Sequence, residues 1–236
     1  MSAGADPVER ALYARAADPA GLDPGWLDVQ RVAELFAVDP PGLGGIVLRG
    51  SASPRRDRVE GWIRELLSDD TPVLRMPAHI TDDRLLGGLA LAATLETGRV
   101  VLERGLLARA DGGVLAIPMA ERLQPEPLAH VCAALDRGEV TLEREGIGEL
   151  VACRVGVLAL DEGLEDERVP EPLADRLALR IDLGALDRRS LPRLALDPAR
   201  VATARARLPG VRISPDAIEA LARSAVALGI ASIRAP

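Results

Sequence analysis

The residues whose types and spacing point to a definite chemistry lie in the loop 50–57, with the sequence GSASPRRD. An apolar, strand-like run precedes the loop, and a helical pattern starts at Val59. A phosphate-binding loop of the form G-x-x-x-x-G-K-[ST] requires this succession of strand, loop and helix. In a working loop the second glycine lets the backbone approach the phosphates, the lysine contacts the terminal phosphates and the hydroxyl binds magnesium. The chain therefore has the setting of a nucleotide site.

Three positions of this loop do not match that chemistry. Arg55, Arg56 and Asp57 stand where the glycine, the lysine and the hydroxyl belong. The carboxylate of Asp57 would face a polyphosphate with like charge, and Pro54 removes one amide donor. We expect weak nucleotide binding or none. Gly50 and Arg56 are the residues of this degenerate loop that could still contact a nucleotide, because an arginine can replace the charge of the lysine.

Residue chemistry alone also allows a simpler interpretation of the loop. It could be an ordinary polar turn before a helix that Ser53 caps and Pro54 begins. The arginines Arg55, Arg56 and Arg58 could bind an anion at the helix N-terminus or form salt bridges along the helix face. Neither interpretation predicts catalysis by this loop.

Composition narrows the classes of protein. The chain has 236 residues, enough for a substantial core, and a formal net charge of -7 that disfavours a nucleic-acid footprint. Cys132 and Cys153 lack the paired spacing of a metal site and are expected to be buried, reduced thiols. His79 and His130 are isolated, so we predict no metal ligands. No apolar run reaches the ~20 residues that a membrane span needs, and no signal peptide is evident, which predicts a cytoplasmic protein.

Strand and helix patterns alternate along most of the chain, which predicts an α/β fold with a mostly parallel sheet and crossover helices. Capping residues before prolines predict helices near 7–17 and 24–38. The expected strands are 46–49, 73–76, 113–117, 155–160 and 179–183, and the helices between them are 55–68, 83–96, 125–137 and 170–177.

Two short β segments, 99–102 and 139–144, interrupt this alternation and are predicted to be hairpin insertions. From residue 191 the pattern becomes helical, with helices over 198–208 and from Ser214 to Leu228. We therefore predict an α/β core domain over 1–188 and a small α-helical lid over 189–236. The lid is expected to be truncated.

Several motifs resemble the magnesium chelatase family of AAA+ proteins in order and spacing. They are DRLLGG at 83–88, LETGR at 95–99, ERGLLARADGGVL at 103–115, VTLEREG at 140–146 and LADRL at 173–177. The resemblance covers about residues 44–183. It implies an AAA+ P-loop-type core with β-hairpin insertions and a helical lid. The family has an active ATPase, the I-type subunit, and a related D-type subunit whose ATPase module is degenerate.

Departures from the active pattern favour the D type, specifically its N-terminal AAA+-like module. The resemblance places an Asp-Glu pair that holds magnesium and polarises the attacking water after the strand 113–117. This chain has Pro118 and Met119 there, which can neither bind a hard cation nor accept a proton. The family's polar sensor asparagine falls approximately at Asp161 and its sensor arginine approximately at Ala231.

One catalytic part is retained. The resemblance identifies Arg176 as an arginine finger that reaches the γ-phosphate held by a neighbouring subunit, with Asp175 beside it to orient it. From the residues alone, Arg176 could equally be a surface arginine paired with Asp175 or Glu171. The acidic run 161–167 lacks the ligand spacing of a calcium loop and is interpreted as a solvated loop, at a subunit interface by this hypothesis.

The resemblance implies a non-hydrolysing platform that assembles a ring with the I-type ATPase subunit and passes its motion to the porphyrin-binding, H-type subunit. The complex would use ATP to insert Mg²⁺ into protoporphyrin IX in chlorophyll or bacteriochlorophyll biosynthesis. No tightly bound cofactor is expected; ATP and Mg²⁺ would belong to the partner at the interface. Two alternatives stay open: an active ATPase of this family or a related MoxR-like protein, and a purely structural adaptor.

Overall fold

The computed structural model describes residues 24–89, 94–96, 98, 102–144, 147–186 and 194–229. Its centre is a five-stranded parallel sheet in the order β2-β5-β8-β1-β9. The strands are β1 (Gly45–Arg49), β2 (Val73–Arg75), β5 (Val114–Pro118), β8 (Gly156–Asp161) and β9 (Leu179–Asp182). The predicted α/β class and all five predicted core strands are confirmed, with ends that differ by at most one residue. The predicted helix 7–17 lies outside the described residues.

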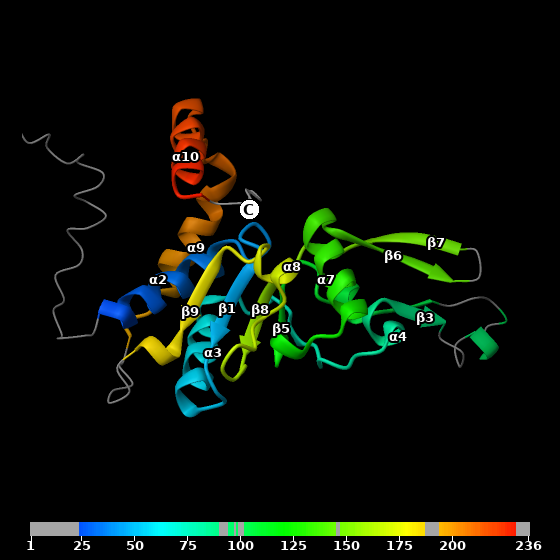
Figure 1. Ribbon diagram of the computed structural model, residues 1–236. Coiled ribbons are helices and arrows are strands. Elements are labelled where there is room, and N and C mark those ends of the chain that lie inside the picture. The colour runs from blue at the N-terminus through cyan, green and yellow to red at the C-terminus, as the bar shows by residue number, and fades with distance from the viewer. Residues whose placement is uncertain are drawn as a thin grey trace, which may run out of the picture.

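The sheet is buried on both faces because helices cover each of them (Figure 1). Along β1, Ile46 and Leu48 point to one hydrophobic cluster and Val47 points to the other. This alternation follows from the two-residue period of a strand. It explains why the strands are continuous apolar runs, as parallel sheets require.

Helices α2 (Pro24–Val38), α3 (Pro54–Leu66) and α9 (Pro198–Arg207) pack on the first face. Trp26 on α2 meets Trp62 on α3 edge to face, with ring centroids 5.8 Å apart. Ser53 accepts a hydrogen bond from the amide of Arg56, and Pro54 follows as the first helical residue. The predicted cap of this helix is therefore confirmed.

The second face is covered by α6 (Leu106–Arg109), α7 (Pro125–Arg137) and α8 (Glu171–Ala174). Helix α7 ends at Gly138, whose positive φ of 68° satisfies the left-handed cap that favours glycine. The turn after α8 leads directly into β9. These helices hold the second group of functional residues described below.

The predicted helix 83–96 is wrong. Helix α4 (Asp82–Leu85) ends after one turn, and β3 (Gly87–Leu89) pairs antiparallel with β4 (Leu102–Arg104). Gly87 has a φ of 108°, which breaks the helix, and β4 supplies partners for the backbone beyond it. The predicted β segment 99–102 falls on residues that are outside the described part, except at its last position.

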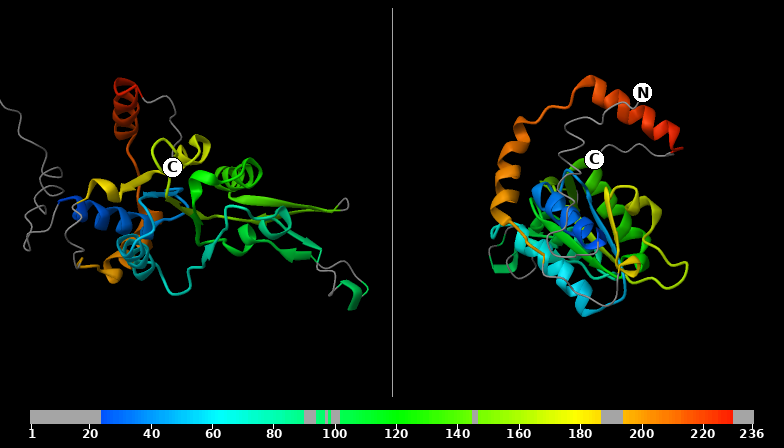
Figure 2. Two further views of the ribbon diagram at one scale, coloured as in Figure 1. Left: turned by 60° about the horizontal axis from the view of Figure 1, so that its bottom comes forward. Right: turned by 90° about the vertical axis from the view of Figure 1, so that its left-hand side faces the viewer.

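The hairpin predicted at 139–144 is confirmed. Strand β6 (Glu139–Arg144) pairs antiparallel with β7 (Ile147–Ala152), which the sequence pattern did not reveal. Both hairpins project on the side of β5 and α7, away from α2 and α9 (Figures 1 and 2). The molecule is therefore elongated in this direction.

The C-terminal part is helical, as predicted, with α9 and α10 (Pro215–Ala227) joined through the short 3-10 turn Leu208–Gly210. Arg200 on α9 forms an ion pair with the buried Glu34 on α2, and Val201 is buried in the core. Helix α10 has no buried residue and stands away from the sheet (Figure 2). The predicted boundary at 188 falls outside the described residues. Within the described part, no helix has the length and apolarity to cross a bilayer.

Candidate functional site

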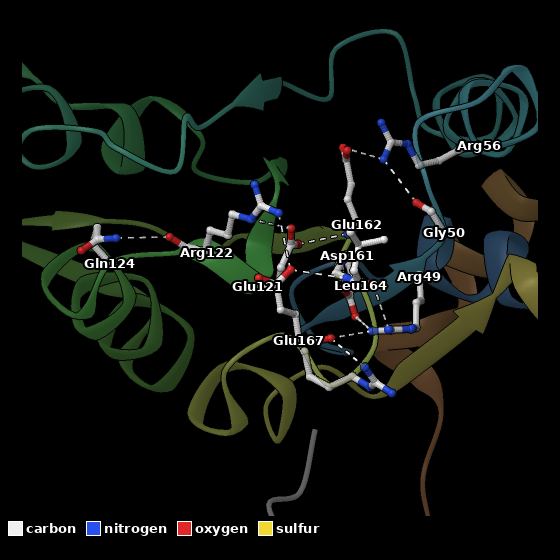
Figure 3. A network of polar contacts seen from close by, with 12 residues as sticks. Arg49, Gly50, Arg56, Glu121, Arg122, Gln124, Asp161, Glu162, Leu164 and Glu167 are labelled. Atoms are coloured by element: carbon white, nitrogen blue, oxygen red, sulfur yellow. Dashed lines mark hydrogen bonds and ion pairs between the residues drawn. The ribbon is translucent and has the colours of Figure 1, made fainter.

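The degenerate loop begins at the carboxyl end of β1, which lies between β8 and β9 (Figure 3). Gly50 has a φ of 152°, and its amide donates to the carbonyl of Asp161 over 2.9 Å. A side chain at this position would press on Leu183. The loop is thereby fixed to the end of β8, at the edge of a parallel sheet where ligands generally bind.

Arg56, which stands at the position of the missing lysine, is bound within the protein. It is buried, and one of its terminal nitrogens donates to Glu162 Oε1 over 2.6 Å and to the carbonyl of Gly50 over 3.4 Å. Its Nε lies 3.6 Å from Glu60 Oε1. A short bond between a guanidinium and a carboxylate is among the stronger hydrogen bonds in proteins. The cation that would meet a phosphate therefore already has two carboxylates of its own chain as counter-ions.

A second arginine ties the acidic loop after β8 to the end of β1. Arg49 donates to Asp161 Oδ2 over 2.7 Å and to the carbonyls of Gly163 and Glu167 over 3.0 Å each. Asp161 is buried, and its other oxygen accepts from the amide of Gly163. The predicted loop at 161–167 is confirmed, but it is folded against β1 and not merely solvated. Asp161, the approximate sensor position, is engaged in this ion pair.

Glu121 joins the same network and was missed from the sequence. Strand β5 ends at Pro118, and Met119 adopts a left-handed backbone with φ 50°. This turn places the Glu121 side chain, which is fully buried, where its Oε2 accepts from the amide of Glu162 over 3.0 Å. Its Oε1 makes no hydrogen bond and lies 3.6 Å from Arg122 Nε. The signal in the sequence was a carboxylate within three residues of a strand end.

Each arginine of this network faces at least one carboxylate of its own chain (Figure 3). Arg49, Arg56 and Arg122 face carboxylates from β8, from the loop that follows it and from the turn after β5. Burial, partly offset by Arg56, raises the pKa of Glu60. No group of three His, Cys, Asp or Glu side chains within the described ranges is arranged to hold a metal ion.

Arg176 lies elsewhere, in the turn between α8 and β9. Its Nε and one terminal nitrogen donate to the two carboxylate oxygens of Asp136 over 2.8 and 2.6 Å, and its other terminal nitrogen donates to the carbonyl of Pro172. Its side chain is 13% exposed, against 43% for Asp136. The hydrogen bonds to Asp136 raise the pKa of Arg176, and the charge of Asp175 adds to this effect. The sequence did not reveal Asp136 because it is 40 residues away in the chain.

The polar network around the loop 50–57 and the ion pair of Arg176 with Asp136 lie at opposite ends of the parallel strands. The carbonyl of Arg176 packs against Gly44, immediately before β1 begins, whereas Gly50 follows the end of β1. The five residues of β1 span about 16 Å. Arg176 therefore cannot reach the phosphate-binding loop of its own chain.

The two cysteines and the two histidines lie outside the groups of charged residues described above. Cys132 and Cys153 are both buried, as predicted, and no disulfide joins them; burial raises the pKa of Cys153 to about 12. The thiol of Cys153 donates to the carbonyl of Leu107 over 3.2 Å. His130 Nε2 lies 3.9 Å from Asp82, and His79 is exposed. Ala231, the approximate second sensor position, lies outside the described residues.

No family model matches the chain. The 60 kDa subunit of magnesium chelatase from Cereibacter sphaeroides is 44% identical over 212 residues, which cover 89% of this chain. The chain belongs to the magnesium chelatase subunit family. It spans 34% of the length of that relative.

Within the magnesium chelatase family the chain is nearer to the larger subunit. The 38 kDa subunit from the same bacterium is 26% identical over 190 residues, 67% of this chain and 56% of its own length. The predicted resemblance to the D type of magnesium chelatase subunit is confirmed by this contrast between 44% and 26%.

The fold also matches that of solved magnesium chelatase subunits. A chain in the cryo-EM-based model of the complex between subunits BchI and BchD aligns with a TM-score of 0.53 and 22% identity. The alignment covers 75% of this chain and 62% of the other. The predicted AAA+ core with hairpin insertions and C-terminal helices is therefore confirmed at the level of the fold.

Proposed function

We propose that this chain is a non-hydrolysing AAA+ platform of a magnesium chelatase. It assembles with the ATPase subunit of that enzyme, completes the neighbour's ATP site with Arg176 and passes the resulting motion to the porphyrin-binding subunit. The complete enzyme inserts Mg²⁺ into protoporphyrin IX for chlorophyll or bacteriochlorophyll biosynthesis. The complex between subunits BchI and BchD, to which the fold is similar, supports the pairing with an ATPase subunit.

The observation that carries the non-hydrolysing role is the pairing of Arg56 with Glu162. The guanidinium that replaces the loop lysine is buried and 2.6 Å from a carboxylate of its own chain. A phosphate would have to displace this carboxylate, while the nearby Asp57 and Glu60 would repel it. The residues of this loop therefore do not fit a nucleotide's phosphates.

The positions that would carry out ATP hydrolysis also hold unsuitable residues. Pro118 and Met119 end β5 and offer neither a magnesium ligand nor a base. Glu121 is a carboxylate in the same region, but it is fully buried and accepts from a backbone amide of the acidic loop. No step of ATP hydrolysis can be built from these groups.

The place of Arg176 supports action on a neighbouring subunit. It lies at the edge of the sheet opposite to the loop of its own chain, so a head-to-tail contact would bring it to the loop of the next protomer. Positive charge at that point stabilises the charge that develops on the transferred phosphoryl group. The role of Asp175 in this proposal is to orient the arginine.

The Arg176→Ala variant tests the finger when it is mixed with the ATPase subunit. We expect normal co-purification, because Asp136, the carboxylate that Arg176 pairs with, is 43% exposed and can be hydrated. We expect ATP hydrolysis lowered about 100-fold at the sites that face this chain. Arg137→Ala, which removes an exposed arginine at the end of α7, is the matched control and should leave hydrolysis unchanged.

A purely structural adaptor is the second candidate, because Arg176 is held by Asp136 in this structure. The adaptor predicts unchanged hydrolysis with Arg176→Ala. Magnesium-dependent turnover by this chain alone would contradict both candidates and favour an active ATPase.

A further inference from the structure

We infer that Asp136 is the positioning residue of Arg176 and that its carboxylate is exchanged for the terminal phosphate of the neighbour's nucleotide when the subunits assemble. This inference rests on the proposed function of Arg176. It assigns a role to a residue of α7 that no motif singled out.

The geometry of the pair is that of a phosphate contact. Two nitrogens of Arg176 face the two oxygens of Asp136 in a parallel, bidentate arrangement. Arginine binds carboxylate and phosphate with the same planar fork. In the free subunit Asp136 therefore occupies the place that two phosphate oxygens would take.

Arg176 is more deeply buried than Asp136, as an exchange of the carboxylate for an anion from solvent requires. The arginine is 13% exposed and the aspartate 43%. An anion that arrives from solvent would meet the pair from the aspartate side. It can displace the carboxylate while Arg176 keeps its hydrogen bond to the carbonyl of Pro172.

The backbone around Arg176 is fixed, so the exchange needs only side-chain movement. The amide of Arg176 donates to the carbonyl of Leu173 over 3.0 Å, and the amide of Ala178 donates to the carbonyl of Leu43 over 3.1 Å. Gly44 packs against the carbonyl of Arg176. Asp136 is held at the end of α7, which packs against α8.

The two anions differ in charge. A terminal phosphate carries more negative charge than a carboxylate and offers three acceptor oxygens, so it binds the fork more strongly once it is within reach. Without a neighbour, Asp136 keeps the guanidinium ordered between the end of α7 and the carbonyl of Pro172. Loss of the aspartate is expected to make Arg176 more available by about fivefold, equivalent to ~1 kcal/mol for an exposed pair.

The first experiment measures this availability on the whole chain without a partner. Phenylglyoxal modifies arginines, and the rate at Arg176 is followed by mass spectrometry of its peptide. We expect about fivefold faster modification in Asp136→Asn. Glu126→Gln removes an exposed acid at the other end of α7 and should have no effect. An unchanged rate in Asp136→Asn would overturn the positioning role.

The second experiment measures the exchange. The chain is titrated into the ATPase subunit with saturating ATP, and the concentration that gives half of its effect on hydrolysis is determined. We expect Asp136→Asn to lower this concentration about fivefold, and to have no effect when Arg176 is already alanine. An equal effect in both backgrounds would show that Asp136 acts through the fold and would refute the exchange.

The two experiments separate this inference from the proposed function. If Arg176→Ala leaves hydrolysis unchanged, the finger and the exchange both fail, whereas a faster modification in Asp136→Asn still supports positioning. If Arg176→Ala lowers hydrolysis and Asp136→Asn changes neither measurement, the proposed function stands and the inference on Asp136 is wrong.

Discussion

At the scale of single residues, carboxylates of the chain itself pair with both arginines for which a phosphate contact was considered. Glu162 faces Arg56 at the degenerate loop, and Asp136 faces Arg176 at the opposite edge. The two pairs differ in burial: the side chains of Arg56 and Glu162 are 6% and 27% exposed, while those of Arg176 and Asp136 are 13% and 43% exposed. The first pair is therefore suited to a permanent structural role and the second to exchange.

Glu162→Gln should destabilise the protein, because it removes the charge that compensates a buried guanidinium. Glu162 is 27% exposed and glutamine can still accept a hydrogen bond, so we expect a loss of about 1–2 kcal/mol. This corresponds to a decrease of about 2–8 °C in melting temperature for a domain of this size. Chemical denaturation at neutral pH measures the free energy directly.

Glu60→Gln is the matched control for this variant. Burial raises the pKa of Glu60, so the folded state holds its proton more tightly than the unfolded state. Its contribution to stability is full below the unfolded pKa and is lost as pH rises through the folded pKa. Glutamine should therefore cost nothing at neutral pH. A loss in Glu60→Gln as large as in Glu162→Gln would show that both carboxylates act alike on Arg56.

At the scale of elements, strand β1 connects the polar network around the loop 50–57 with the ion pair of Arg176 and Asp136. Gly44 precedes it and packs against the carbonyl of Arg176, and Gly50 follows it at the loop. Because β1 pairs with both β8 and β9, a shift at one of its ends is resisted by the register of two neighbours. The network and the ion pair therefore keep their separation.

Gly44→Ala tests the rigidity of this arrangement. Gly44 has a φ of 68°, and a Cβ there would lie 2.0 Å from the carbonyl oxygen of Arg176. The backbone conformation alone costs about 1–2 kcal/mol, and relief of the clash must displace the turn that carries Arg176. We expect a loss of about 2–4 kcal/mol in the free energy of unfolding together with weaker stimulation of the ATPase subunit.

Gly112→Ala serves as the comparison for that variant, since Gly112 also has a positive φ of 74° but no atom near its missing Cβ. Gly112→Ala should lose only the stability that the strained backbone conformation costs. Its effect on the ATPase subunit should be unchanged. Equal behaviour of the two variants would mean that the contact with Arg176 has no consequence.

The elements that the sequence predicted correctly are those set by local chemistry. The core strands have strong apolar runs, and α3 has both a serine cap and a proline at its first position. The helix 83–96 was wrong because pairing of β3 with β4, a contact between segments 15 residues apart, outweighs the helical pattern beyond Leu85. Strand β7 was missed because its identity depends on its partner β6.

Sequence motifs predicted the loop of the candidate site but not the partners of its charged residues. The loop, Arg56 and the lack of acidic residues at Pro118 and Met119 are all visible in the sequence. The partners are not: Glu162 lies 106 residues from Arg56, and Asp136 lies 40 residues from Arg176. Only the topology of the sheet brings these charges together. The roles of Arg176 and Asp175 stay predictions.

At the scale of the whole molecule, the described core is built from two hydrophobic clusters, one on each face of the sheet. Side chains of the chain cover both faces of the sheet, and ion pairs join the ends of β1, β8 and the acidic loop. In a nucleotide-dependent fold the ligand's phosphates would be part of this balance of charges. Here the protein supplies all the charges of the described network.

ATP should therefore leave the stability of the isolated chain unchanged. A ligand that binds only the folded state stabilises it by RT ln(1 + [L]/Kd), so a Kd of about 0.1 mM would add ~1.4 kcal/mol at about 1 mM ATP. That would raise the melting temperature of a domain of this size by about 3–6 °C. We expect no shift with ATP or ADP, with or without Mg²⁺, in a thermal scan at fixed ionic strength. The ATPase subunit, scanned in parallel, should shift. A similar rise for this chain would mean that Arg56 exchanges Glu162 for phosphate, and the loop 50–57 would then have to be regarded as a working nucleotide site.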